Sequence, residues 1–178
     1  MLSRKAQLRR RAREIALQLV YMNELRPCPA EEALEFFPAE EALGLFGREL
    51  AKDGDAAPEK DKFPSVDSFD ISLEDAERDE IISYVRELFC GICADYAEVE
   101  NTVRMHLESK WRSERLNSID KSIISLAVYE GIIAKKVPQN IAISEAVHLA
   151  KLFGAEDSPK FVNGVLGKIA RSCDEEHK

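Results

Sequence analysis

The stretch FGAEDSPKFVNGVL, residues 153–166, decides the fold because one helical pattern ends in it and another begins. Gly154 is predicted to end the first helix, since glycine adopts the left-handed backbone of a helix C-terminus without strain. Ser158 is predicted to cap the next helix with its side-chain oxygen, and Pro159 suits the first helical position because it has no amide hydrogen. Asp157 lies where the helix dipole favours negative charge. The stretch therefore predicts two helices joined by a short turn.

Apolar residues at helical spacing continue in both directions from this junction. Val137-Pro138 breaks the pattern, because proline disfavours helical geometry in the residue before it. No segment alternates with the two-residue period of a strand over strand length. We therefore expect an all-α protein, a compact bundle of about six to eight helices in a single domain over residues 1–178. The predicted helices cover about residues 12–22, 81–96, 118–135 with Ser118 as cap, 141–153 and 159–173. Residues 99–107 continue the spacing of 81–96, either in a second helix or after a kink.

Acidic charge is concentrated in one part of the chain. The 178 residues carry a formal net charge of -8, but the stretch from Arg26 to Glu80 alone holds 17 acidic and 6 basic residues. The remainder is therefore slightly basic. Several prolines and a polar run fall within residues 26–72. We interpret 26–72 as an acidic, partly flexible insertion with one or two short helices.

The N-terminus is basic, with six lysines and arginines and no acidic residue in residues 1–13. Such a cluster, just ahead of a helix or on its first turns, suits phosphate binding. The alternative is a solvated tail without a ligand. Trp111 lies in a second basic run, where it either stacks on a nucleobase or, as we favour, anchors a loop against the bundle.

Nothing in the sequence predicts an enzyme, a metal site or a cofactor. Cys90 and Cys93 form a CxxC pair inside a helical pattern rather than at a helix start, so we interpret them as core residues, with a redox pair as the alternative. The histidines have no metal-ligand spacing, and there is no phosphate loop or dinucleotide fingerprint. Without an apolar run of about 20 residues or a signal peptide, we expect a cytoplasmic protein that lies in no membrane.

Four blocks of sequence carry a family resemblance: RRRARE at 9–14 leading into LVY at 19–21, RLNSIDK at 115–121 with LAVYE at 126–130, VP at 137–138 followed by IAISEAV at 141–147, and the junction at 153–166. In this order they resemble the NusB family of bacterial transcription antitermination factors. The resemblance implies an all-helical fold of two small subdomains. It also implies binding to boxA RNA of ribosomal RNA leaders as a heterodimer with NusE, a ribosomal small-subunit protein, so that RNA polymerase in an antitermination complex reads through terminators.

The resemblance also assigns site residues by position. The arginines would neutralise backbone phosphates while the junction contacts unstacked bases, and Asp157 either accepts hydrogen bonds from a base edge or only caps its helix. The implied RNA face comprises Arg9, Arg10, Arg11, Arg13, Phe153, Gly154, Asp157 and Phe161. The implied NusE face comprises Tyr21, Leu25 and Asp120, and the family also admits a homodimer through it. The alternative function is a helical protein-interaction adaptor without sequence-specific RNA binding.

Overall fold

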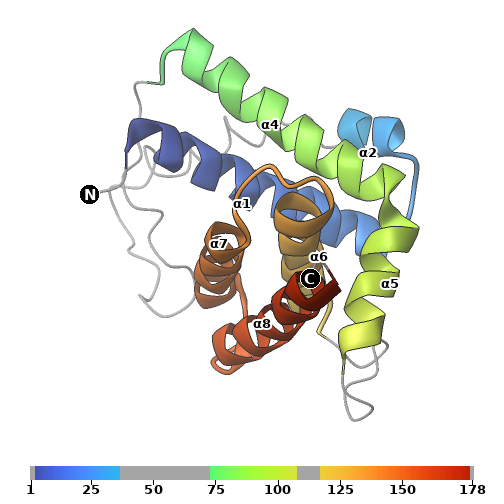
Figure 1. Ribbon diagram of the computed structural model, residues 1–178. Helices are drawn as coiled ribbons and strands as arrows, with labels where there is room; N and C mark the ends of the chain where they lie inside the picture. Colours follow the sequence, from blue (N-terminus) through green and yellow to red (C-terminus); the bar gives the residue numbers. More distant parts are fainter. Residues whose placement is uncertain (1–2, 37–72, 108–116, 177–178) are drawn as a thin grey trace.

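A computed structural model describes residues 3–36, 73–107 and 117–176, and all regular structure in these ranges is helical (Figure 1). The all-α prediction is confirmed. The α-helices are α1 (Arg4–Leu25), α2 (Ala30–Phe36), α4 (Asp75–Ala94), α5 (Tyr96–His106), α6 (Ser118–Val128), α7 (Gln139–Phe153) and α8 (Ser158–Glu176), and a short π-helix, η2 (Tyr129–Ile133), continues α6.

Helices α1 and α4 lie side by side and run in the same direction (Figure 1). At their starts, the Arg4 guanidinium donates to the Glu77 carboxylate at 2.6 Å. Near their ends, the Asn23 amide contacts the Cys93 sulfur at 3.7 Å. The two helices are therefore parallel along most of their length.

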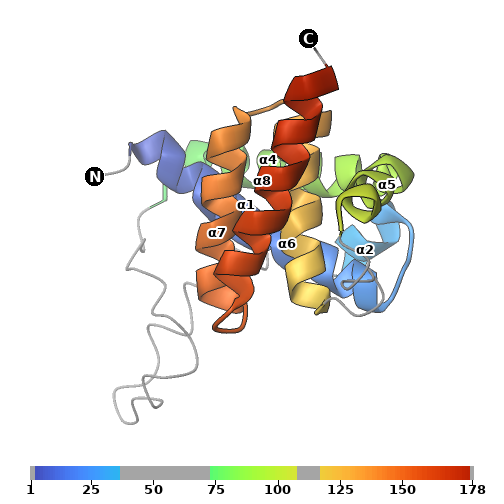
Figure 2. The same ribbon diagram turned by 60° about the horizontal axis from the view of Figure 1, so that its bottom comes forward.

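Helices α6, α7 and α8 form a second group that packs against α1 (Figure 2). Large side chains from both groups meet in the core, where Ile15 of α1, Phe89 of α4, Ile123 of α6 and Leu166 of α8 are all fully buried. Each such burial contributes about 1.5–3 kcal/mol relative to an exposed side chain. The two groups of helices agree with the predicted pair of small helical subdomains.

The bounds of α7 and α8 lie close to the predicted ones, whereas α1 and α4 begin well ahead of the predicted starts at residues 12 and 81. Helix α6 has a different cap from the predicted one. The Asn117 side chain accepts a hydrogen bond from the Ile119 amide at 3.4 Å, so Ser118 is the first helical residue and not the cap. Asp95 separates α4 from α5. Of the two alternatives for residues 99–107, the second helix is therefore confirmed.

At the junction both predicted helices are present, but the backbone of Gly154 and the hydrogen bond of Ser158 differ from the predicted ones. Gly154 has φ -89° and ψ 177°, an extended backbone rather than a left-handed one. Its small size is needed because an added Cβ would lie 2.5 Å from Cβ of Ser158 and 2.7 Å from the Ala150 carbonyl oxygen. The Ser158 hydroxyl accepts from the Ala155 amide at 2.9 Å, which closes the turn instead of capping the amides ahead. Gly154 thus ends α7 as predicted but without the predicted left-handed backbone, and the predicted capping role of Ser158 is wrong.

The predicted acidic insertion at residues 26–72 contains α2, which packs against α1 and α4. This helix is one of the short helices expected there. The rest of the insertion, residues 37–72, and Trp111 lie outside the described residues. The predictions for them stay predictions.

Gly91, between the two cysteines of the CxxC pair, lies where the Tyr129 side chain crosses α4. A Cβ at this position would be 1.8 Å from the Tyr129 hydroxyl oxygen and 2.2 Å from Cζ. We expect Gly91→Ala to displace Tyr129 and lower the free energy of unfolding by about 1–3 kcal/mol, although alanine is the better helix former. Gly164→Ala is the matched control, because that helical glycine has no atom within 4 Å of a built Cβ, and it should stabilise by up to about 1 kcal/mol. Urea unfolding measures the free energy of unfolding of both variants. If both variants were stabilised, or both destabilised, the expectation would be wrong.

Candidate nucleic-acid interface

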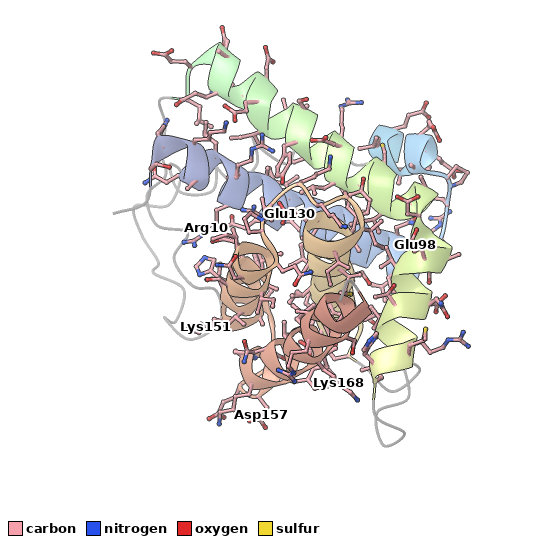
Figure 3. All side chains as sticks on the ribbon, viewed as in Figure 1. Arg10, Glu98, Glu130, Lys151, Asp157 and Lys168 are labelled. Atoms are coloured by element: carbon pink, nitrogen blue, oxygen red, sulfur yellow. The ribbon has the colours of Figure 1, made fainter. Side chains whose placement is uncertain are left out.

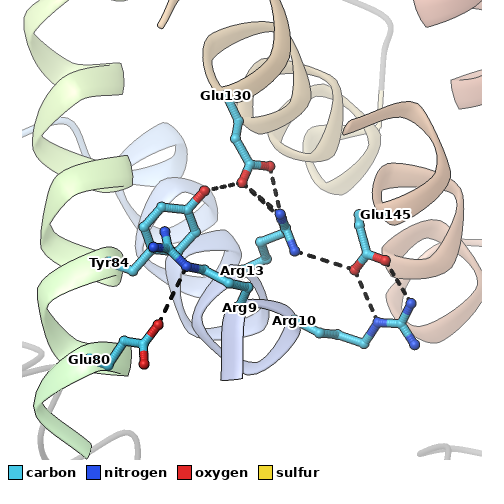
Figure 4. A network of polar contacts seen from close by, with 7 residues as sticks. All are labelled: Arg9, Arg10, Arg13, Glu80, Tyr84, Glu130 and Glu145. Atoms are coloured by element: carbon cyan, nitrogen blue, oxygen red, sulfur yellow. Dashed lines mark hydrogen bonds and ion pairs between the residues drawn. The ribbon is translucent and has the colours of Figure 1, made fainter. Parts of the chain in front are cut away.

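The N-terminal arginines lie within α1 rather than on an arm ahead of it. The helix begins at Arg4, and the Ser3 hydroxyl caps it by accepting a hydrogen bond from the Ala6 amide at 3.3 Å. Residues 9–13 therefore occupy about the second and third turns, where the face on which each arginine lies decides its surroundings. Figure 4 shows that Arg9 points toward α4, Arg13 toward η2 and Arg10 toward α7.

Arg13 is buried in a network of hydrogen bonds and charges. Its side chain is 5% exposed and pairs with Glu130, 1% exposed, through two contacts of 2.8 Å, from Nη2 to Oε1 and from Nε to Oε2. The Tyr84 hydroxyl also donates to Glu130 (Figure 4). Burial by itself would lower the pKa of Arg13, but hydrogen bonding and charge from Glu130 outweigh it and the pKa is raised. Arg13 therefore stays charged inside the fold, with little surface left for a ligand.

Arg10 forms a two-pronged ion pair with Glu145 of α7. Nη2 lies 2.6 Å from Oε1 and Nε lies 3.0 Å from Oε2, and Arg13 approaches the same carboxylate at 3.5 Å. Burial opposes the charge on Glu145, but the two arginines outweigh it and hold the pKa of Glu145 below its ordinary value. The Arg10 side chain remains 27% exposed. It therefore keeps donors free of Glu145 at the protein surface.

Arg9 and Arg11 differ in exposure, since the Arg9 side chain is partly exposed and the Arg11 side chain is buried. The Arg9 guanidinium lies over the Tyr84 ring, 3.6 Å from its centroid, and 3.8 Å from the Glu80 carboxylate, with its side chain 33% exposed. The Arg11 side chain is buried and donates to Glu14 at 2.7 Å. Burial raises the pKa of Glu14 against the pull of Arg11. Of the four implied arginines, Arg9 and Arg10 are thus the more accessible pair.

The junction residues lie on the same side of the molecule as Arg10. Figure 3 shows Arg10, then Lys151, then Asp157 in sequence along one edge. Asp157 is exposed, whereas Phe153 and Phe161 are half-buried and pack against the hydrophobic core. The exposed edges of the two rings and the Asp157 carboxylate are the surface that the junction presents to a ligand.

The implied partner residues come together at another place, where the end of α1 meets the start of α6. An ion pair between Glu24 and Lys121, 2.5 Å long, joins these two helix ends. Leu25 is 60% exposed and Tyr21 is half-buried. Asp120 is only 8% exposed, and its Oδ1 has no hydrogen-bond partner among the described groups. The end of α1 therefore offers apolar surface, whereas the unpaired oxygen of Asp120 is buried in the first turn of α6.

Comparison with known proteins places this arrangement in a family. The profile of the NusB family matches residues 42–171 of the chain, well over half of its length. The chain belongs to the NusB family. The resemblance found in the sequence is confirmed.

Relatives match over nearly their whole length. A Clostridium botulinum protein named transcription antitermination protein NusB is 32% identical over 161 residues, which are 90% of this chain and 98% of that protein. A Desulforudis audaxviator protein of the same name is 31% identical over 167 residues, 94% of this chain and 96% of the relative. The T. maritima NusB structure superposes with a TM-score of 0.58 at 24% identity, covering 92% of this chain and 90% of that one, which supports the fold.

Family membership also bears on the predicted chemistry. NusB relatives are named as antitermination proteins rather than as enzymes, so the prediction that this chain is not an enzyme is confirmed. Within the described part of the chain, no cluster of His, Cys, Asp or Glu has a metal-binding arrangement, and no helix is long and apolar enough to cross a membrane.

The CxxC pair of this NusB family member has the properties of structural thiols. Cys93 packs against the core, and burial raises its pKa to about 11. Cys90 is exposed, contrary to the expected core position, and desolvation also raises its pKa. Raised thiol pKa values disfavour the reactive thiolate. The redox alternative therefore has no support from the surroundings of these thiols.

Sequence reasoning missed the residues that hold the arginines: Tyr84, Glu130 and Glu145. One signal was present, because Glu130 lies three residues after Ala127 on the apolar stripe of α6 and so had to face the core. A buried carboxylate requires a charged or hydrogen-bonding partner. Arg13 lies on the apolar stripe of α1 in the same way, which made the two a predictable pair.

The lowered pKa of Glu145 predicts a pH-dependent contribution to stability. Because the folded pKa lies below the ordinary value of 4.5, the contribution is complete above pH 4.5 and is lost as the pH falls through the folded pKa. We expect Glu145→Gln to lower the free energy of unfolding by about 1–3 kcal/mol at pH 7, and the difference from the parent to shrink below pH 4.5. The raised pKa of Glu14 acts in the opposite direction, and its largest cause, burial, is common to both proteins. Urea unfolding across this pH range measures the difference, and a constant gap would contradict the assignment.

Proposed function

We propose that this chain is a cytoplasmic transcription antitermination factor that binds boxA RNA together with NusE and promotes read-through by RNA polymerase. The observation that carries the proposal is the match to antitermination proteins over almost the entire length of both chains, 90% of this chain and 98% of the Clostridium botulinum relative. A domain that is shared along its whole length is expected to share its binding surfaces as well. The site geometry bears on where those surfaces lie.

For the RNA face we propose two parts with different tasks. Arg9 and Arg10 contact backbone phosphates, which positions the strand without reading its sequence. Phe153, Gly154, Asp157 and Phe161 form the base-reading part, because single-stranded RNA is read through unstacked bases against aromatic rings and hydrogen-bonding groups.

Arg11 and Arg13 lie beneath this face and act on it through other side chains. Their side chains are 8% and 5% exposed, and both pair with carboxylates inside the protein. In this proposal Arg13 orients Glu130 and Glu145, and Glu145 in turn orients Arg10 (Figure 4). Their contribution to RNA binding is therefore indirect.

For the NusE face we propose Tyr21, Leu25 and Asp120. The exposed leucine and the half-buried tyrosine offer an apolar contact, and the Asp120 carboxylate, 8% exposed with an unpaired Oδ1, has to be uncovered to accept a hydrogen bond from NusE. Interfaces of this kind combine an apolar centre with a few specific polar contacts. A homodimer through this surface would compete with NusE.

A mobility-shift titration tests the proposal directly. Parent protein is titrated against boxA RNA and against a scrambled RNA of equal length, each with and without purified NusE. We expect preference for boxA, tighter binding with NusE and steep weakening with salt, since each phosphate contact releases counterions. Binding of NusE without preference for boxA would instead indicate the protein-interaction adaptor.

A further inference from the structure

A polar groove runs between α1, α7 and α8 and adjoins the proposed RNA face. It is lined by Arg10 of α1, by Asn140, Ser144, His148 and Lys151 of α7, by Asn163 of α8 and by two aliphatic residues of α7. The four polar α7 residues are spaced by four, four and three positions, which places them along one face of the helix. None of these lining residues is acidic, so the groove offers mainly hydrogen-bond donors and positive charge.

The nearest carboxylate on α7 does not reverse this charge. Glu145 is bound by both prongs of Arg10, which offsets its negative charge, and Arg13, whose main partner is Glu130, lies 3.5 Å from it. Arg10 uses Nε and Nη2 for this pair, and a guanidinium has five N–H donors in all. Donors of Arg10 are left for a ligand in the groove.

The groove lies between the two parts of the proposed RNA face, which makes an RNA strand the ligand to consider. Lys151 is exposed in the last turn of α7, and Figure 3 places it between Arg10 and Asp157. A strand that contacts both Arg10 and the junction therefore passes this groove. Lysine is a point charge and suits phosphate, and the groove has no Phe, Tyr or Trp on which a base would stack, the imidazole of His148 being the one aromatic ring in its lining.

We propose that the groove binds a backbone phosphate of the RNA strand, with Lys151 and Asn163 as ligands beside Arg10. This inference rests on the proposed RNA-binding function and adds a phosphate subsite between its two parts. Contacts to phosphate position a strand and carry no sequence information. Lys151 thus contributes equally to boxA and to other single strands that follow the same path.

The test compares Lys151→Ala, Asn163→Ala and the matched control Lys168→Ala, another exposed lysine, on α8 and outside the groove. We expect Lys151→Ala to weaken boxA binding about fivefold to tenfold and to reduce the salt slope by about 0.7, the value for one phosphate on a single strand. Asn163→Ala should weaken binding by less without changing the slope, and Lys168→Ala should stay within about twofold of the parent.

Neutral methylphosphonate linkages, placed one at a time in the RNA, locate the contacted phosphate. At that linkage the parent loses affinity and Lys151→Ala loses no more, because the contact is already absent. If the parent binds boxA and Lys151→Ala binds it with the same affinity and salt slope, the phosphate subsite is wrong while the proposed function stands. A parent that fails to bind boxA, with or without NusE, would overturn the proposed function and this inference with it.

Discussion

Replacing Arg13 by methionine is expected to lower the free energy of unfolding by about 3–5 kcal/mol, the range for removing one partner of a buried ion pair. Methionine keeps much of the apolar stem but removes the guanidinium. Glu130 then stays 1% exposed, and among the described side chains the Tyr84 hydroxyl is its remaining hydrogen-bond donor. The loss is large because an uncompensated buried charge, rather than a missing contact, determines it.

A triple variant separates this explanation from a simple loss of packing. Arg13→Met with Glu130→Leu and Tyr84→Phe removes the buried charge and the two groups that served it. We expect the triple variant to be more stable than Arg13→Met alone, because replacing a whole buried polar cluster by apolar side chains is often neutral. Denaturant unfolding at equal pH and salt provides the comparison. A triple variant as unstable as the sum of its single changes would show that packing, and not charge, explains the loss.

The helical layout could be predicted from the sequence because its signals are local. The helix predicted over 141–153 is observed as α7 from Gln139 to Phe153, and the one predicted over 159–173 as α8 from Ser158 to Glu176. Apolar spacing and proline positions are sufficient for this, since each depends on neighbours within about one turn.

Details of the junction could not be predicted, because they depend on contacts across the turn. Gly154 is required by the approach of Ser158 and the Ala150 carbonyl, not by a left-handed backbone. Asn and Ser are both good caps, so sequence alone did not decide between Asn117 and Ser118. Cap identity is set by which side chain reaches the free amides.

Which arginines are buried in ion pairs and which stay exposed also could not be predicted from the local sequence. Adjacent arginines look alike as a basic cluster, yet Arg13 pairs with residues 117 and 132 positions away, whereas Arg9 stays half-exposed over Tyr84. Only the packing of η2 and α7 against α1 brings those carboxylates to Arg13. The site residues implied by the family therefore remain proposals, now with different expected roles.

Replacing Arg9 and Arg10 together by alanine is expected to weaken boxA binding by about 30- to 100-fold at moderate salt. Each lost hydrogen-bonded contact to a charged phosphate is worth at least about 1 kcal/mol, and two such contacts give a combined loss of about 2–3 kcal/mol. The slope of log affinity against log salt should become less steep by about 1.4 for two phosphates on a single strand. Salt-dependent mobility shifts measure both quantities.

A control with the same change of charge is Arg104→Ala with Lys168→Ala, two exposed residues on α5 and α8. It should leave affinity within about threefold of the parent, since exposed charges at a distance are screened. Arg9→Lys with Arg10→Lys keeps the charge but loses the planar fork that holds Glu145, so it should retain most of the salt slope and still lose affinity. If the double alanine variant is folded by thermal unfolding yet binds boxA with the parent's affinity and slope, phosphate contact by these arginines is wrong.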